Sequence, residues 1–236
     1  MNVVHLYFYT DSVAFPRIED QTLEQTWPFL LKDRLEAEYN VNVYLCLRGL
    51  GGATIGEIRS IFLRDIGYFR GQGGDTASIV IFNTGIVDAA PQPFTFFLRN
   101  IAKIPLVGPR FWCQVEKPLT QKRALLQKIW WYRRTTPERF RHIFNQMIRQ
   151  VKRLQMEAIS IDTPLTPASM ECRSPGLRES INFYNAIKHE NSDARHIAMD
   201  WVRDRHYLED GHHFKPEGHW MLADRLLEAV QDLLRK

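Results

Sequence analysis

Asp11 and Ser12 lie in the stretch YTDSVAFPR, directly after an apolar run that opens the chain. At the end of a strand, such a pair usually caps a helix or forms a turn. A serine nucleophile would also lie there, at the carboxyl edge of a sheet, if a base and a group that orients the base were close by. Asp210 and His213 near the other end of the chain are of the right types. Ser12 is therefore open to two interpretations, a cap or a nucleophile.

Runs rich in β-branched and aromatic residues predict the strands that would position these groups. They are residues 3–9, 41–47, 76–84, 156–162 and 195–201, and the run at 76–84 is typical of a doubly buried parallel strand. Helical stretches alternate with them, which favours βαβ units. We predict an α/β fold, a three-layer α/β/α sandwich with about five parallel strands in flavodoxin-like order.

Apolar periodicity predicts the helices. Thr136 is a plausible cap and Pro137 a first residue for a helix that extends beyond residue 150. Further helices are expected near 21–39, near 177–188 and from Pro216 to Leu234. The apolar stripes predict core residues, which are Phe140, Ile143, Phe144, Met147, Ile148, Val151, Leu154, Ile181, Tyr184, Ile187, Met221, Leu222, Leu226, Val230 and Leu233.

Polar or glycine-rich segments follow the predicted strands, at the edge where ligands bind in such sheets. Beyond Asp11-Ser12 they are LRGLGGAT (47–54), NTGIVDAAP (83–91) and EDGHHFKPEGH (209–219). In this order and placement they resemble the SGNH, or GDSL-type, serine hydrolase superfamily. The resemblance extends over nearly the whole chain, and it implies the SGNH hydrolase fold.

The resemblance implies the catalytic residues Ser12, Asp210 and His213. Ser12 would attack the carbonyl carbon, His213 would act as general base and then general acid, and Asp210 would orient the imidazole. His212 is the rival base, but the three-residue spacing from Asp210 favours His213. Low-ranking candidates for substrate binding are Asp11, Val87, Asp88, Trp130 and Trp131.

The oxyanion hole implied by the resemblance is incomplete. The backbone N–H groups of Ser12 and Gly52 carry over, but Val87 stands where the family has an asparagine. Losing one such donor typically costs about 2.7–4 kcal/mol in the transition state. Three interpretations stay open. Asn83 or Thr84 would replace the missing donor, the enzyme would work with the two backbone donors, or the site would be inactive. The segment GIVDAAP is most similar to a branch linked to bacterial surface-polysaccharide synthesis.

Composition narrows the alternatives. The 236 residues are 44% hydrophobic and 25% charged, which suits one globular domain over residues 1–236. No stretch approaches the roughly 18 apolar residues of a membrane span, and the opening run is predicted to be a strand rather than a signal peptide.

Three cysteines, Cys46, Cys113 and Cys172, favour reduced thiols and a cytoplasmic location. The spacing of His206, His212, His213 and His219 fits no familiar zinc pattern, so we predict no metal and no cofactor.

Charge is concentrated in one region. From Arg99 to Arg153 there are 14 Lys and Arg against two acids, whereas the rest of the chain has 17 against 25. The aromatic-rich part of this region, about 93–135, is predicted to be a helical insertion. It would cap the site through Trp112, Trp130, Trp131, Arg133 and Arg134, dock on a membrane surface or partner, or pack its aromatics inside. No nucleic-acid motif accompanies it, and we predict no nucleic-acid binding.

We therefore predict a serine esterase that cleaves an O-acyl ester, for which an O-acetyl ester is a candidate, on a glycan or related small substrate. Lipase, thioesterase or acyltransferase activity would use the same residues. A catalytically silent module that binds a glycan or protein is the alternative from another class. The oligomeric state is not predicted.

Overall fold

The computed structural model describes residues 3–19, 21–69, 76–91 and 133–235. Its centre is a five-stranded sheet in the order β2-β1-β3-β4-β5, and every neighbouring pair is parallel. The strands are β1 (Val3–Thr10), β2 (Asn42–Gly49), β3 (Thr76–Asn83), β4 (Glu157–Ile161) and β5 (Arg195–Ile197). This is the predicted flavodoxin-like order, with the strand order reversing between β1 and β3.

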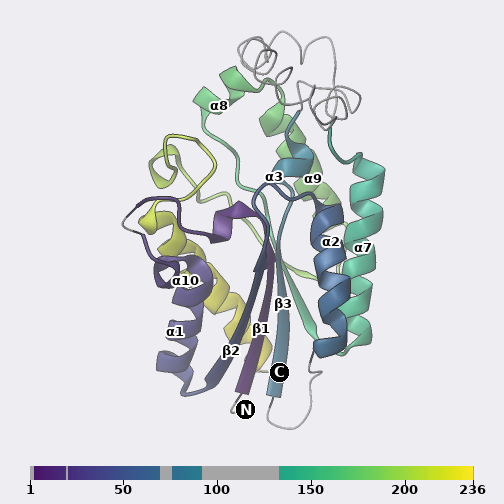
Figure 1. The fold of residues 1–236 in the computed structure, drawn as a ribbon, viewed down its shortest axis with the longest axis vertical. Helices are drawn as coiled ribbons and strands as arrows, with labels where there is room; N and C mark the ends of the chain where they lie inside the picture. The colour runs from purple at the N-terminus through teal and green to yellow at the C-terminus, as the bar shows by residue number, and fades with distance from the viewer. Residues whose placement is uncertain (1–2, 20, 70–75, 92–132, 236) are drawn as a thin grey trace, which may run out of the picture.

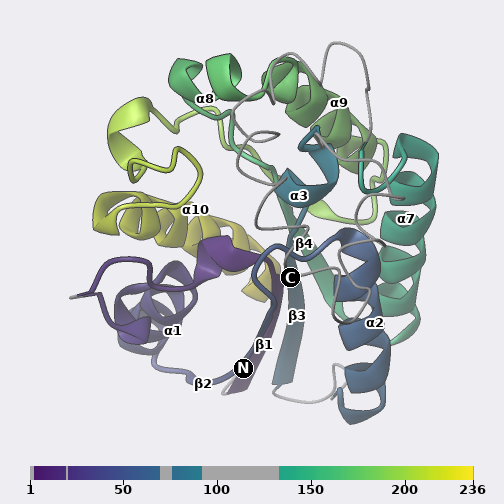
Figure 2. The ribbon, with the colours of Figure 1, turned by 45° about the horizontal axis from the view of Figure 1, so that its top comes forward.

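Helices cover both faces of the sheet (Figures 1 and 2). Helices α1 (Trp27–Tyr39) and α10 (Pro216–Leu234) pack together on one face. The other face carries α2 (Ile55–Asp65), α7 (Pro137–Arg153) and α9 (Leu177–His189). The short helices α3 (Ile86–Ala89) and α8 (Ala168–Arg173) lie near the carboxyl edge. The remaining turns are 3-10 helices, namely η1 (Ser12–Ala14), η2 (Leu23–Gln25), η3 (Ile66–Tyr68) and η4 (Asp204–His206).

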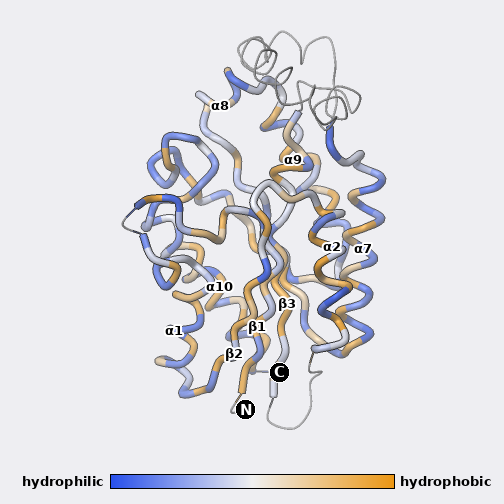
Figure 3. The backbone as a smooth tube through the Cα atoms, viewed as in Figure 1, coloured by the Kyte–Doolittle hydropathy of each residue, from blue (hydrophilic) through white to orange (hydrophobic). Residues whose placement is uncertain are grey.

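Alternation along the strands divides the core into two apolar layers. On β1, Leu6 and Phe8 face α1 and α10, whereas Tyr7 and Tyr9 face α2 and α7. Figure 3 shows the resulting pattern, with apolar strands inside and polar stretches along the outer helices. β3 is buried at every position after its first residue, as predicted. Burial of this extent on two faces fixes the register of the central strands, so their carboxyl ends meet at one edge.

Helix α7 confirms its prediction closely. Thr136 caps it by accepting a hydrogen bond from the Arg139 N–H, and Pro137 is its first residue. Most of the core residues predicted from periodicity are buried. The exceptions are Leu154, Met221 and Leu233, which are half-buried, and Leu227 of α10 is buried in addition.

Two elements are shorter than predicted. The helix expected near 21–39 begins at Trp27, because residues 23–25 form η2. Pro28 has no N–H to donate within a helix, so it fits in the first turn of α1. The strand expected over 195–201 ends at Ile197. The Asp162 N–H donates to the Ile197 carbonyl at 3.0 Å, and beyond that point β4 offers no further pairing residue.

No helix in the described ranges is long and apolar enough to cross a membrane. Cys46 and Cys172 are free thiols, and Cys113 lies outside the described residues. Residues 93–132 of the predicted insertion, with Trp112, Trp130 and Trp131, also lie outside them. The insertion and the extent of a single domain therefore stay predictions.

Candidate active site

The end of β1 positions Ser12. The Asp11 N–H donates to the Asn83 carbonyl at 3.1 Å, which ties the chain to β3. The Asp11 carboxylate then accepts the Val13 N–H at 3.0 Å and caps η1. Ser12 is the first residue of η1 and is 7% exposed. Cap and candidate nucleophile are thus neighbouring residues, because Asp11 supplies the cap that places Ser12.

A folded loop before α10 positions His213. Tyr207 and Phe214 form an antiparallel bridge, and the Leu208 N–H donates to the His213 carbonyl at 2.9 Å. Gly211 has φ +75°, a conformation that favours glycine, and this turn returns the chain over Asp210. The Asp210 Oδ1 accepts the backbone N–H groups of His212 and His213, each at 3.0 Å.

Ser12, His213 and Asp210 form a continuous hydrogen-bonded chain. Nδ1 of His213 lies 2.5 Å from Asp210 Oδ2, and its Nε2 lies 2.8 Å from the Ser12 Oγ. Because a carboxylate only accepts, Nδ1 carries the hydrogen and Nε2 accepts from the hydroxyl. His212 instead turns its Nδ1 toward the Asp210 carbonyl at 3.0 Å. The arrangement is the one that a Ser-His-Asp triad requires.

Electrostatics favour an ionised Asp210 beside a neutral imidazole. Burial opposes ionisation of Asp210, but the N–H groups of His213 and His212 and the imidazole lower its pKa to about 2. Burial also lowers the pKa of His213 below its ordinary value, and the hydrogen bond to Asp210 only partly offsets this. His213 is therefore unprotonated at neutral pH, as a general base must be.

Two backbone donors lie on the loops at the edge. Among the described residues, neither the Ser12 N–H nor the Gly52 N–H has a hydrogen-bond acceptor. Gly52 has φ +69°. Its carbonyl accepts a hydrogen bond from Nη1 of Arg134 at 2.8 Å, so a residue at the end of the predicted insertion fixes the glycine loop. Unpaired N–H groups are available for charge that develops on an oxygen.

The loop after β3 contains Val87 and Asp88 on α3. Val87 is half-buried and has no donor to offer. Asp88 is buried, and its carboxylate accepts the Ile55 N–H at 2.9 Å, which ties α3 to the start of α2. The contacts of Asp11 and Asp88 thus position backbone. That these two residues and Val87 bind substrate stays a prediction.

Asn83 and Thr84, the two substitute donors considered, are both buried. Within the described residues, Asn83 Nδ2 and Thr84 Oγ1 have no hydrogen-bond partner. Asn83 lines a small pocket with Val13, Tyr207 and His212, on the α10 side of the sheet. Its amide therefore lies close to the His212 loop, and a role as donor to the oxyanion stays a prediction.

A buried lysine beneath these loops was not predicted from sequence. Lys188 of α9 is 1% exposed, and its Nζ donates to the Ile161 carbonyl at 2.9 Å and to Thr163 Oγ1 at 3.4 Å. Thr163 in turn donates to the Thr84 carbonyl at 3.3 Å. A Cβ at Gly85, where φ is +129°, would lie 2.8 Å from Thr163 Oγ1 and 3.5 Å from Lys188 Nζ. The glycine thus leaves room for Thr163, the side chain that Lys188 contacts.

The charges around Lys188 compensate one another in part. Burial lowers the pKa of Lys188 to about 8, while Asp162, Asp11 and Asp88 act in the opposite direction. Burial raises the pKa of Asp11 and of Asp88 to about 6 in each case. A lysine near the carboxyl end of a helix usually points into solvent, so periodicity gave no signal for this residue.

The remaining histidines considered from sequence are structural. His219 Nδ1 accepts the Trp27 N–H at 3.4 Å, and burial lowers its pKa to about 4. His206 Nδ1 accepts the Arg203 N–H at 3.0 Å. The four histidines 206, 212, 213 and 219 do not gather into one cluster.

Comparisons with known proteins agree at the level of the fold. Neither a protein-family model nor a curated protein sequence matches the chain. The chain is similar to a lipase/acylhydrolase from Enterococcus faecalis at 15% identity and a TM-score of 0.63, over 98% of this chain and 96% of that one.

Two esterases are similarly related in structure. Axe2, an acetylxylan esterase from Geobacillus stearothermophilus, gives 14% identity and a TM-score of 0.61, over 97% of this chain and 94% of that one. The psychrotrophic esterase EstA from Pseudoalteromonas sp. gives 11% identity and a TM-score of 0.58 over the whole of both chains. The chain has the SGNH hydrolase fold, as its sequence predicts. The branch linked to polysaccharide synthesis stays a prediction.

Proposed function

We propose that this protein is a serine esterase that cleaves an O-acyl ester through an acyl-Ser12 intermediate. The observation that carries the proposal is the unbroken chain from Ser12 Oγ through His213 to Asp210, at 2.8 Å and 2.5 Å. These side chains come from opposite ends of the sequence, 201 residues apart in the case of Ser12 and His213. The names of the structural neighbours, which are esterases and an acylhydrolase, support the same reaction class.

In the acylation step, His213 Nε2 takes the hydroxyl proton as Ser12 Oγ attacks the ester carbonyl carbon. Asp210 stabilises the imidazolium that forms. The tetrahedral intermediate collapses, its C–O bond to the alcohol breaks, and His213 returns the proton to the leaving oxygen. A water molecule, deprotonated by His213, then attacks the acyl-Ser12 carbonyl carbon. The carbon–Oγ bond to Ser12 breaks, the acid leaves, and His213 returns the proton to the Ser12 Oγ.

The N–H groups of Ser12 and Gly52 are the proposed oxyanion donors. Both lack an acceptor within the described residues, and both belong to loops held by further hydrogen bonds. Val87 provides no third donor, so we expect a slower enzyme than one with an asparagine at this position.

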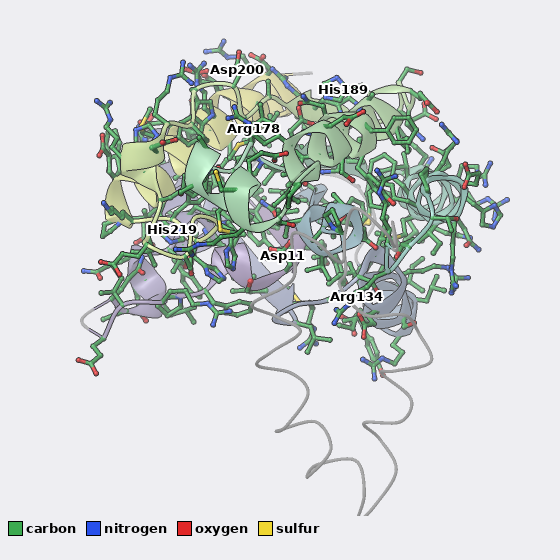
Figure 4. All side chains as sticks on the ribbon, turned by 90° about the horizontal axis from the view of Figure 1, so that it is seen from above. Asp11, Arg134, Arg178, His189, Asp200 and His219 are labelled. Carbon is green, nitrogen blue, oxygen red and sulfur yellow. The ribbon has the colours of Figure 1, made fainter. Side chains whose placement is uncertain are left out.

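The proposed substrate is an O-acetyl or other short O-acyl ester on a glycan. A cleft of about 310 Å³ has Arg178, Asn182 and Asp200 in its lining, which supports a polar substrate. It shares Thr163 and Thr166 with the small pocket that Asp11 and His212 line. In Figure 4, seen from above, Arg178 lies between Asp200 and Asp11. The name of the neighbour Axe2, an acetylxylan esterase, also supports this choice.

A fluorophosphonate probe tests the reaction directly, because it labels an activated serine. We expect labelling and p-nitrophenyl acetate hydrolysis by the wild type, and neither by Ser12→Ala or His213→Ala. The neighbour EstA was inhibited by monoethylphosphonate, which makes phosphonates suitable probes. A wild type that is neither labelled nor active would refute the esterase proposal.

Acyl-chain length and acceptor separate the related activities. Acetyl and butyryl esters should be hydrolysed faster than octanoyl and longer esters if the substrate is a glycan with a short acyl group. A preference for long chains or thioesters would favour a lipase or thioesterase. Transfer of the acyl group to an added sugar, measured against its release as free acid, would reveal an acyltransferase.

A catalytically silent glycan-binding module is the second candidate, and Val87 is the observation that favours it. In that case the wild type would bind acetylated oligosaccharides in a calorimetric titration without hydrolysing them. Ser12→Ala would then leave the affinity unchanged.

A further inference from the structure

A second group of ligand-type side chains lies where β4, α9 and β5 meet. Asp162 follows β4 directly and is 7% exposed, His189 is the last residue of α9, and His196 lies in β5. One potential ligand atom from each residue lies within 4.8 Å of those from the other two. The rings of His189 and His196 stack at 4.6 Å between centroids.

The hydrogen bonds of His196 fix its tautomer. Its Nε2 lies 2.9 Å from the Asn191 carbonyl oxygen, which can only accept, so Nε2 carries the hydrogen. Its Nδ1 therefore holds a lone pair, is buried, and has no partner among the described residues. A backbone carbonyl that accepts from one ring nitrogen is the usual support of a metal-binding histidine.

His189 and Asp162 supply the other two donors. Nε2 of His189 lies 2.9 Å and 3.0 Å from the two Asp162 carboxylate oxygens. When no metal is bound, a hydrogen on Nε2 lies between the imidazole and the carboxylate. A cation would take its place once the hydrogen moves to Nδ1, the other nitrogen of the same ring.

We propose that Asp162, His189 and His196 form a binding site for a divalent cation of the zinc class. Two imidazole nitrogens and one carboxylate suit zinc, and three protein ligands leave a coordination position open for water. Mg²⁺ and Ca²⁺ prefer oxygen ligands and are not expected to bind.

The site would act on stability. A cation there joins the ends of β4 and α9 to β5, the three-residue edge strand. In Figure 4, His189 lies well away from Asp11, which adjoins Ser12. A ligand that binds only the folded chain stabilises it by mass action, so zinc at a hundred times Kd should raise Tm by about 5–10 °C.

Calorimetric titration of the chelator-treated full chain with ZnCl2 tests the proposal. We expect one zinc per chain, visible ligand-field absorption when Co²⁺ replaces zinc, and no binding of Mg²⁺. His196→Gln and Asp162→Asn should abolish binding, with folding checked by circular dichroism. His212→Gln should retain binding, and it is the matched control because Asp210, His212 and His213 also lie within ligand distance of one another.

A wild type that binds no zinc at millimolar concentration would overturn the proposal. So would binding that is lost in His212→Gln and kept in His196→Gln. Since neither outcome depends on ester hydrolysis, this proposal and the proposed function fail independently.

Discussion

Two clusters in this molecule each contain one aspartate and two histidines, but they leave different atoms available. In the cluster of Asp210, His212 and His213, both nitrogens of His213 are engaged, one by the carboxylate and one by the Ser12 hydroxyl. In the cluster of Asp162, His189 and His196, the His196 Nδ1 has no partner within the described residues. The same residue types thus lead to a polarised hydroxyl in one place and to a free lone pair in the other.

The variant with the largest expected effect on activity removes the Ser12 hydroxyl, to which one of the two clusters is hydrogen-bonded. We expect Ser12→Ala to lower kcat by about a millionfold, because the nucleophile is lost. Ser60→Ala is the matched control, since the Ser60 hydroxyl bonds only to the Gly56 carbonyl on the surface of α2. The rate of p-nitrophenyl acetate hydrolysis measures the activity of both variants. Activity that survives in Ser12→Ala would assign the chemistry elsewhere.

Exchanging each aspartate for asparagine compares the clusters directly. Asp210→Asn should lower kcat by about ten-thousandfold, because the amide no longer holds the hydrogen on His213 Nδ1. Asp162→Asn should lower kcat by less than about tenfold while abolishing zinc binding. Parallel assays of turnover and zinc titration check this. Equal losses of turnover in the two variants would mean that the clusters act as one site.

The third test sharpens the difference between the incomplete oxyanion hole and the complete triad. Val87→Asn should raise kcat by about tenfold to a hundredfold if the added amide reaches the oxyanion. Val87→Leu keeps the site apolar and serves as control. Steady-state kinetics on acetyl esters give the comparison. If Val87→Asn is no faster, another donor already acts there, and Asn83→Ala would identify it.

The smallest effect concerns pH. A general base must be unprotonated, and burial lowers the pKa of His213 below its ordinary value of 6.5. The acid limb of kcat/KM should therefore have its midpoint below pH 6.5, so activity persists as the pH falls through 6.5. A pH profile from 4.5 to 8 measures the midpoint, and NMR titration of the imidazole assigns it. A midpoint above 6.5 would contradict the burial of His213.

The sheet could be predicted because each central strand is a continuous apolar run, and burial on both faces leaves few alternatives. The last strand was overestimated because its apolar residues, such as Met199, are buried in the loop that follows β5. Helix α2 was not singled out, although Thr54 and Glu57 form a capping box at its start. That signal is in the sequence and could have been used.

The candidate site was predictable in part. Asp210 and His213 are three residues apart, so their pairing is local, whereas the contact of His213 with Ser12 depends on the whole sheet. The proposed zinc site had no such signal. Its residues come from three elements, and the spacing of His189 and His196 matches no familiar ligand pattern. Lys188 was missed for a similar reason, since its partners Ile161 and Thr163 come from another part of the chain.

The hydrogen bond from Arg134 to the Gly52 carbonyl joins the end of the predicted insertion, within the basic region, to a proposed oxyanion donor. If a ligand of the basic region displaces Arg134, binding at these two places is thermodynamically linked. A ligand that changes the position of Arg134 changes the affinity of the site for a transition-state analogue, and by reciprocity the analogue changes the affinity for that ligand by the same factor. The loop that holds the oxyanion donor would thus report on whatever the basic region binds.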